Sequence, residues 1–212
     1  MFSKYMAMVL GLGLAVGVSA VSAQNMNPQA TKAYQWILEG GYNLGGDNIA
    51  KGTYTNTGTS WDVKAGKGLQ GGVGLQYAFS DEWSSQMTVG YLVDTTDGLN
   101  GDVAFKRMPV ELMMTYNISS RLRLGGGWHQ SYNSKRYNTG VAAFLGNEKF
   151  KADPGAVVQV AYFFKPYKNF KKTGEEISSG LGLRYVTEKF TSEKTQKTYQ
   201  ADHVGVFFMM YF

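Results

Sequence analysis

Apolar and polar residues alternate with a period of two along much of the chain. In the first such segment Tyr34, Trp36 and Leu38 occupy one parity, while Gln35 and Glu39 occupy the other. A period of two is typical of a β-strand whose two faces meet different surroundings. The alternation is found in eight segments, namely 34–44, 69–79, 83–93, 107–117, 122–129, 157–164, 180–185 and 203–212. The pattern therefore predicts an all-β protein.

The two faces of these segments differ in an unusual way. The apolar parity is rich in aromatic residues and carries no charge, whereas the other parity contains glycine, glutamine and the charged residues Glu39, Arg107, Glu111, Arg123 and Arg184. A polar face of small residues is typical of the interior of a membrane barrel, and an aromatic face is typical of the surface in contact with lipid. An open sheet edge in hydrocarbon would leave backbone N–H and C=O groups unpaired, so the first strand must pair with the last. We expect an eight-stranded antiparallel up-and-down transmembrane β-barrel with both termini in the periplasm.

The aromatic residues of the apolar face fall into two levels, as the interfacial girdles of a membrane barrel do. One level contains Trp36, Tyr77, Phe79, Trp83, Tyr116, Tyr162, Phe164 and Phe212. The other level contains Tyr42, Tyr91, Trp128 and Tyr185. Such barrels also alternate short periplasmic turns with longer surface loops.

The connections between the segments support the same topology. Residues 80–82 and 118–121 are short, 165–176 is a longer basic connection, and the remaining connections are polar and of moderate or greater length, namely 45–68, 94–102, 130–154 and 189–200. We expect these last four to be hydrophilic, mobile surface loops, with Trp61 exposed. Pro109 has no N–H to donate, so we expect a bulge or a strong bend at that position.

The N-terminal region has the features of a targeting signal. Lys4 precedes an uncharged apolar run of 13 residues, Met6–Val18, and Val21–Ala23 matches the small-x-small pattern that a signal peptidase cleaves. We expect residues 1–23 to be a signal peptide, residues 24–33 a polar leader and residues 34–212 the barrel.

Composition excludes several other classes of protein. A mean hydropathy of −0.25 over 212 residues excludes a helical membrane protein. The chain has no cysteine, which excludes a disulfide scaffold and a thiolate zinc site. Its formal charge of +5 is spread through connections and forms no nucleic-acid-binding tract.

The C-terminal segment resembles the signature that the barrel-assembly machinery reads in bacterial outer-membrane barrels. Its members are Val204, Val206, Phe208, Met210, Tyr211 and the final residue Phe212. Together with Met108–Leu112 (MPVEL), Arg123–Gly127 (RLGGG) and Gly182–Tyr185 (GLRY), it is similar to a group of uncharacterised outer-membrane β-barrel domain proteins, akin in size to OmpA/OmpX-type barrels. The resemblance implies a Gram-negative outer membrane, the assembly machinery as a partner and no assigned reaction. The chain stops at the last strand, so we expect no peptidoglycan-binding domain of the kind that two-domain OmpA proteins carry.

The inward residues make the lumen the first candidate site. Eight strands enclose a space that side chains can fill or that one small ligand can occupy. We expect Glu39, Glu111, Arg123 and Arg184 to form a structural ion-pair network, and the alternative is a gated ion path. Inward glycines should make room for Phe163, Phe207, Met209 and Tyr211. We find no cofactor motif, and His203 alone is no metal site.

One short segment looks catalytic. His129-Gln130-Ser131-Tyr132-Asn133 is similar to the His-x-Ser-Asn motif of PagL-type lipid A deacylases, in which a histidine activates a serine. Here Tyr132 stands where the asparagine should be, and the motif lies on a different strand. We therefore interpret the segment as a loop rim and expect no enzyme.

Loop charges suggest partners in the membrane. Lys135, Arg136, Lys149 and Lys151 are able to pair with lipopolysaccharide phosphates, or they are solvated loop charges. We expect a monomeric, non-enzymatic integral outer-membrane barrel, in contact with outer-membrane lipids and lipopolysaccharide, that serves envelope integrity or surface contact. The alternative is a narrow channel or a lateral conduit for a small or hydrophobic solute, as in OmpW-type barrels, and a lipid A ester hydrolase is a third hypothesis.

Overall fold

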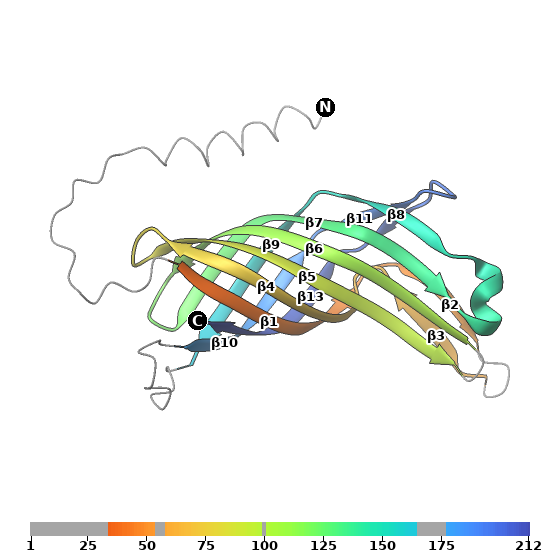
Figure 1. Cartoon of the computed structure of the whole chain (residues 1–212), viewed down its shortest axis with the longest axis horizontal. Helices are drawn as coiled ribbons and strands as arrows, with labels where there is room; N and C mark the ends of the chain where they lie inside the picture. The colour runs from red at the N-terminus through yellow and green to blue at the C-terminus, as the bar shows by residue number, and fades with distance from the viewer. Residues whose placement is uncertain (1–33, 54–57, 99–100, 165–176) are drawn as a thin grey trace. The chain divides into compact units, whose positions relative to one another are not determined.

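The computed structural model describes residues 34–53, 58–98, 101–164 and 177–212. The expected signal peptide (1–23), the polar leader (24–33) and the basic connection 165–176 lie outside the described residues. Eight antiparallel strands form a closed barrel: β1 (Tyr34–Gly45), β4 (Gly68–Ala78), β5 (Trp83–Gly98), β6 (Gly101–Asn117), β7 (Leu122–Asn138), β9 (Gly155–Phe163), β10 (Ser178–Val186) and β13 (His203–Tyr211). Each strand pairs with its neighbours in this order, and β1 pairs with β13 from Ile37↔Tyr211 to Gly45↔His203 (Figure 1). The predicted fold class is confirmed.

The outer surface of the barrel is apolar, as the alternation predicts. Leu69 is 63% exposed and Leu112 is 53% exposed, whereas Glu39 and Glu111, on the other parity, are buried. Side chains of the expected girdle also lie on the outer surface, and some are in contact across strands: the ring centres of Trp83 and Tyr116 are 4.8 Å apart. A closed sheet with this outer surface has the architecture of a transmembrane β-barrel.

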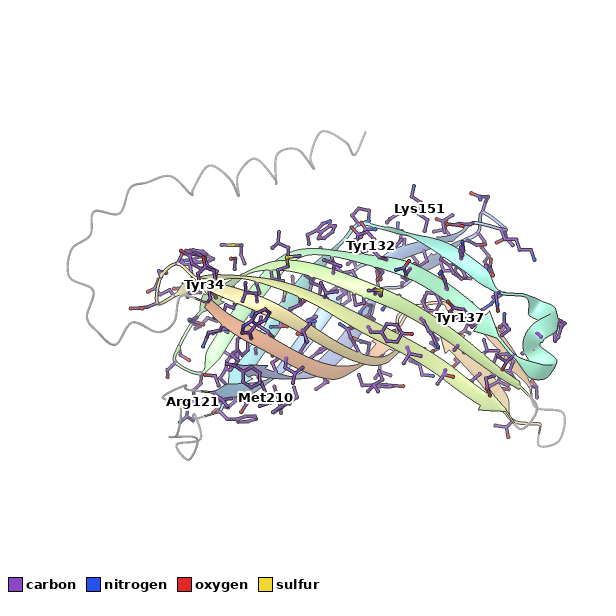
Figure 2. The ribbon with its side chains drawn as sticks, in the orientation of Figure 1. Tyr34, Arg121, Tyr132, Tyr137, Lys151 and Met210 are labelled. Carbon is purple, nitrogen blue, oxygen red and sulfur yellow. The ribbon has the colours of Figure 1, made fainter. Side chains whose placement is uncertain are left out.

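The two ends of the barrel differ. At one end, which we call the turn end, β1 begins, β13 finishes, and tight turns join β4 to β5 and β6 to β7. Ser80 and Ser119 stabilise these turns, because their hydroxyls accept backbone N–H hydrogen bonds from Trp83 and Leu122. We call the opposite end the loop end. Figure 2 shows Arg121 and Met210 near the turn end and Tyr137 and Lys151 in the other half of the barrel.

The loop end is more ordered than the sequence pattern suggests. The expected loops contain the strands β2 (Asn48–Thr53), β3 (Ser60–Lys64), β8 (Glu148–Asp153), β11 (Lys189–Ser192) and β12 (Thr198–Gln200), and the 3-10 helix η1 (Gly140–Leu145). Strands β5, β6 and β7 also continue well beyond the predicted segments. The expectation of mobile hydrophilic loops is therefore wrong for the part of these connections that the structure describes.

A second apolar core explains this order. Buried apolar side chains from the extended strands and the short hairpins pack together at the loop end, namely Ile49, Ala50, Val63, Ala65, Val103, Phe105, Ala142, Phe150, Ala152, Phe190, Tyr199 and Ala201. Phe105 makes edge contacts with Phe150 and Phe190, at ring distances of 5.5 and 5.4 Å. Trp61, which we expected to be exposed, is partly buried against this core. We call this group the loop-end core.

The bulge expected near Pro109 is present on the neighbouring strand. The register between β6 and β7 shifts between Lys106 and Met108, and β7 supplies the extra residue. Asn133 lies there with a φ of 51°, a left-handed conformation that asparagine tolerates better than most residues. The bulge changes which parity of β7 faces inward, so that both Ser131 and Ser134 are buried.

Large inward side chains fill the turn half of the lumen, and glycines make room for them as expected. A Cβ atom at Gly205 would lie 2.5 Å from the ring of Phe207, and one at Gly182 would lie 2.7 Å from the methyl group of Met209. No helix among the described residues has the length and apolar character needed to cross a membrane.

Candidate functional site

Arg184 is the centre of a buried network in the lumen. Its Nη1 and Nη2 atoms donate to the two carboxylate oxygens of Glu39 at 3.0 and 2.7 Å, and Nη1 also lies 2.8 Å from Oε2 of Glu111. Gln159 accepts two further hydrogen bonds from the same guanidinium, at 2.9 and 2.7 Å. The planar face of the guanidinium lies 4.2 Å from the centre of the Phe207 ring. All donors of Arg184 are thus directed at fixed partners.

A second part of the network lies toward the loop end. Nη1 of Arg107 donates to Oε2 of Glu188 at 2.6 Å, and both side chains are fully buried. His129 joins the two parts, because its Nδ1 lies 3.0 Å from Oε1 of Glu111 and its Nε2 lies 3.4 Å from Oε2 of Glu188. We call Glu39, Arg107, Glu111, His129, Arg184 and Glu188 the lumen network.

The geometry of His129 bears on the charge of the network. Three carboxylates and two guanidiniums leave one negative charge without a positive partner. Both ring nitrogens of His129 face carboxylate oxygens. Nδ1 is within hydrogen-bond distance of Glu111, whereas Nε2 makes no hydrogen bond within the described part of the chain. Protonation of the His129 ring would make the network neutral.

Glu188 belongs to the connection that follows β10. Burial raises the pKa of its carboxyl group, but the Arg107 guanidinium, the His129 ring and the hydrogen bond from Ser131 outweigh this effect and hold the pKa below its usual range. The Ser131 bond comes from the backbone N–H, at 3.0 Å. Glu188 is therefore a charged link between the end of β10 and the wall of β6 and β7.

The structure brings together three of the four residues expected in the lumen: Glu39, Glu111 and Arg184. Arg123 lies nearer the turn end and, contrary to the expected ion-pair network, forms no ion pair among the described residues. Its Nε and Nη1 donate to Asn117 and Gln76 at 2.8 and 2.7 Å, and its guanidinium lies 4.6 Å from the centre of the Phe163 ring. Amide oxygens and an aromatic face therefore stabilise this cation in place of a carboxylate.

Sequence reasoning left three members out of the network. Arg107 and His129 both lie on the inward parity, and this was sufficient to predict that their side chains face the lumen. His129 was instead interpreted as part of a loop rim. In the structure it is only 1% exposed and lies in the lumen. Glu188 follows a predicted strand and carried no signal, since its partners are distant in the sequence.

The resemblance to a lipid A deacylase motif finds no support in the geometry of this segment. Ser131 and His129 both face the lumen, yet the ring nitrogens of His129 are directed at Glu111 and Glu188. The Ser131 hydroxyl has no hydrogen-bond partner within the described part of the chain. A serine activated by a histidine requires a hydrogen bond between them.

Each end of the barrel has a hollow. The hollow at the turn end has a volume of about 290 Å³ and is lined by Gln35, Asn117, Arg123 and Tyr211, among others. The hollow at the loop end, about 740 Å³ and more open, lies between the β2–β3 hairpin and β5. Within the described residues, no group of three histidine, aspartate or glutamate side chains is arranged to hold a metal ion.

The longest interruption of strand pairing in the described barrel wall lies between β7 and the β8–β9 segment. β7 pairs with β9 as far as His129↔Gly155, and with β8 only from Lys135↔Lys149. Between these points, in the described structure, no ladder pairing joins residues 130–134 to β8 or β9. Two side chains close the interval: Gln130 donates to the Ala152 carbonyl at 2.8 Å, and Glu188 accepts the Ser131 N–H.

The residues of the expected C-terminal assembly signal face both sides of the wall. Val204, Val206 and Phe208 are exposed on the outer surface, and Met210 is half-buried on the same parity. Tyr211 points into the lumen, where its hydroxyl accepts a hydrogen bond from Gln86 at 2.6 Å. Backbone hydrogen bonds between Phe212 and Trp36 hold the end of the chain against β1.

Solved structures similar to this chain include small outer-membrane proteins. OprG from Pseudomonas aeruginosa is 14% identical, with 85% of this chain and 97% of that chain covered and a TM-score of 0.46. Ail, the attachment invasion locus protein of Yersinia pestis, solved in complex with the heparin analogue sucrose octasulfate, is 13% identical, with coverages of 84% and 95% and a TM-score of 0.44. AlkL, solved in DMPC lipid bilayers, is 11% identical, with coverages of 92% and 93% and a TM-score of 0.40.

No family model and no curated protein sequence matches the chain. The closed barrel is therefore established by the strand pairing of the chain itself.

Proposed function

We propose that this protein is an integral outer-membrane barrel that does not conduct, carries out no catalysis and acts through its loop end in envelope integrity or surface contact. The apolar outer surface between the two aromatic levels supports insertion in a membrane. In this placement the turn end faces the periplasm, the loop end faces the exterior, and the protein is a monomer whose C-terminal strand is read by the assembly machinery.

The main observation in support of the proposal is that Arg184 forms ion pairs across the lumen. Its carboxylate partners, Glu39 and Glu111, come from β1 and β6, while Arg184 itself comes from β10. Other strands separate these three around the barrel. Strand β13 lies between β10 and β1. Strands β4 and β5 lie between β1 and β6, and strands β7 and β9 lie between β6 and β10. The three side chains therefore meet from three widely spaced parts of the wall and occupy the centre of the lumen.

The loop-end core supports the same proposal. It places a second, apolar barrier above the lumen network, and Phe190 connects the two because the Arg107 guanidinium lies 5.3 Å from its ring centre. A solute would have to displace both. The loop end in turn offers a folded surface, built on β-hairpins, for contacts outside the cell.

Single-channel recording in planar lipid bilayers tests the closed lumen. We expect the wild-type protein to show no stable open level. The variant Glu39→Ala/Glu111→Ala/Arg184→Ala removes the central side chains without leaving an unpaired charge, and Phe190→Ala truncates a buried side chain of the loop-end core. We expect the variant that combines all four substitutions to give a measurable conductance if it retains the gel mobility of the folded barrel. A stable open level in the wild-type protein would contradict the proposal.

A deletion strain tests the role in the cell. We expect altered permeability to large antibiotics or altered adhesion, with an unchanged pattern of lipid A acylation by mass spectrometry. A change in acylation that depends on Ser131 would instead support the hydrolase hypothesis.

A second function, a lateral conduit for a hydrophobic solute, is favoured by the interruption between β7 and the β8–β9 segment. Gln130 holds this interval closed in the structure. If a solute leaves the barrel here, Gln130→Ala will speed the uptake of a fluorescent long-chain fatty acid by cells that express the protein. Equal uptake by wild-type, variant and deletion strains would remove this function.

A further inference from the structure

Three lysines lie directly opposite one another on the outer face of three neighbouring strands. Lys106 of β6 pairs with Lys135 of β7, and Lys135 pairs with Lys149 of β8. Their neighbours along the strands, Arg107, Arg136 and Glu148, are buried, so the three lysines point outward. We call these three residues the lysine row.

The lysine row lacks the partners that the inward charges have. On the inner face of the same strands, Arg136 lies 2.9 Å from Glu148. In the described part of the chain, by contrast, no carboxylate lies within ion-pairing distance of the three outward amino groups. Glu193 is near in the fold, since its backbone N–H donates to the Lys149 carbonyl, but it forms no ion pair with the row. Among the described residues, the amino group of Lys106 lies 5.4 Å from the centre of the Tyr137 ring.

Such an arrangement is unfavourable without a counter-ion. Residues directly opposite on neighbouring strands have Cβ atoms about 5 Å apart, and like charges in these positions destabilise the sheet. Lys151, exposed on the same face of β8, adds a fourth positive charge (Figure 2). An anion outside the protein would relieve the repulsion.

The position of the lysine row along the barrel axis indicates which kind of anion binds there. Along the outward parity of β6, the apolar residues Met114, Leu112, Val110 and Met108 are followed by Lys106. Tyr116, in the aromatic level at the turn end, is ten residues from Lys106. A rise of about 3.3 Å per residue and a tilt of about 40° place the two about 25 Å apart along the barrel axis, which is the height of the apolar band of a membrane barrel. The lysine row thus begins where the hydrocarbon ends.

We propose that the lysine row binds the phosphate groups of phosphorylated lipid A in the outer leaflet. This inference rests on the proposed function, because it requires the loop end to face the exterior of an outer membrane. A phosphomonoester carries a charge of about −1.5 to −2 near neutral pH and has three acceptor oxygens, so one such group is able to neutralise two lysines. The row lies on the β6–β8 side of the barrel and therefore defines one face to which the lipid binds.

The test compares two triple variants with the same change in charge. Lys106→Gln/Lys135→Gln/Lys149→Gln removes the row, and Lys51→Gln/Lys194→Gln/Lys197→Gln removes three lysines elsewhere at the loop end. Each protein is inserted in phosphatidylcholine vesicles that contain diphosphoryl lipid A, dephosphorylated lipid A, or phosphatidylglycerol matched in total charge. The measurement is the unfolding midpoint, followed by tryptophan fluorescence and heat-dependent gel mobility, with inorganic phosphate added to plain vesicles as a further arm.

We expect the midpoint of the wild-type protein and of the control variant to rise by several degrees with diphosphoryl lipid A, and that of the row variant to stay unchanged. In plain vesicles the row variant should have a midpoint at or above that of the wild type, because the repulsion between the lysines is removed. If the lysines only stabilised the fold, their replacement would lower the unfolding midpoint in plain vesicles.

Three results would overturn the inference: no rise for the wild-type protein, an equal rise for the row variant, or an equal rise with phosphatidylglycerol or inorganic phosphate. If the row variant does not fold, Lys135→Gln alone removes the central charge and should remove most of the rise. A chain that does not insert in any vesicle would contradict the proposed function, whereas insertion without a lipid A effect contradicts this inference alone.

Discussion

The turn half and the loop half of the barrel share the strands β5, β6 and β7, but these strands assign polar and apolar residues to opposite faces in the two halves. On β6, Glu111 faces the lumen and Leu112 faces outward, but closer to the loop end Phe105 faces inward and Lys106 faces outward. The strand alternates without interruption, and only the assignment of polar and apolar residues to the two faces changes. The change occurs over the residues from Met108 to Lys106.

This difference shows that each half is adapted to the solvent around it. In the turn half the outside is apolar, so the interior holds the polar groups and neutralises them with one another. In the proposed membrane placement water replaces lipid around the loop half, and burial of aromatic side chains again stabilises the fold. Four substitutions test the comparison, and they are described from the largest expected effect to the smallest.

Arg184→Ala should be the most destabilising of these. It leaves Glu39 and Glu111 buried without their shared cation, and removal of one partner of a buried ion pair typically costs about 3–5 kcal/mol. Thermal unfolding in detergent, followed by circular dichroism, measures the loss. Arg121→Ala, at an exposed arginine of the turn end, is the control and should have little effect. An unchanged midpoint for Arg184→Ala would show that the network does not stabilise the turn half.

Phe190→Ala tests the loop half in the same way. Phe190 is fully buried against Phe105, and truncation of a buried phenylalanine costs about 3–5 kcal/mol. The loss should be local, so we expect limited proteolysis to cleave the loop end faster while the rest of the barrel stays resistant. Phe144→Ala, at a side chain that is 85% exposed, should leave the cleavage rate unchanged. If Phe190→Ala also unfolds the turn half, the two halves form one cooperative unit.

Lysine substitutions on the outer face locate the boundary between the halves. Leu112→Lys places a charge near mid-depth of the apolar band, which costs about 2–4 kcal/mol. Ala104→Lys places the same charge on the same face of the same strand beyond Lys106, where we expect almost no cost. Urea titrations of both variants in lipid vesicles give the two values, and equal values would refute the proposed height of the membrane.

Arg123→Met should have the smallest effect of the four. The substitution removes the contact of the guanidinium with Phe163 and Tyr211, which we expect to cost about 1–2 kcal/mol. The methionine side chain takes the place of the carbon chain of the arginine. Since Arg123 has no carboxylate partner in the described structure, no charge is left uncompensated. A loss as large as that of Arg184→Ala would mean that Arg123 has a charged partner after all.

The sequence predicted the turn half well because its signal is local. Alternation within single strands was sufficient to assign the inward parity, and therefore to identify Glu39, Glu111 and Arg184 as neighbours in the lumen. It did not show that Arg123 has no carboxylate partner in the described structure, since the partners of an inward residue depend on the register between strands and on their tilt.

The loop half was not predicted because its signal is spread over distant segments. Phe105 lies just before a predicted strand, whereas Phe150 and Phe190 come from two separate connections, and none of them belongs to a long apolar run. The bulge at Asn133 adds to the difficulty, because it shifts the parity of β7 in the middle of the strand. A reader of the sequence who continues the alternation past this point assigns Lys135 and Arg136 to the wrong faces.

The closure of the sheet between β1 and β13 has a consequence for how the chain folds. Arg184 is 145 positions from Glu39 in the sequence, and the two meet only after the first and last strands have joined. Until that moment these charges remain hydrated, and a partly assembled sheet cannot enter the hydrocarbon with them uncompensated. Joining of the chain ends, dehydration of the charges and passage into the bilayer should therefore take place as one concerted event late in biogenesis.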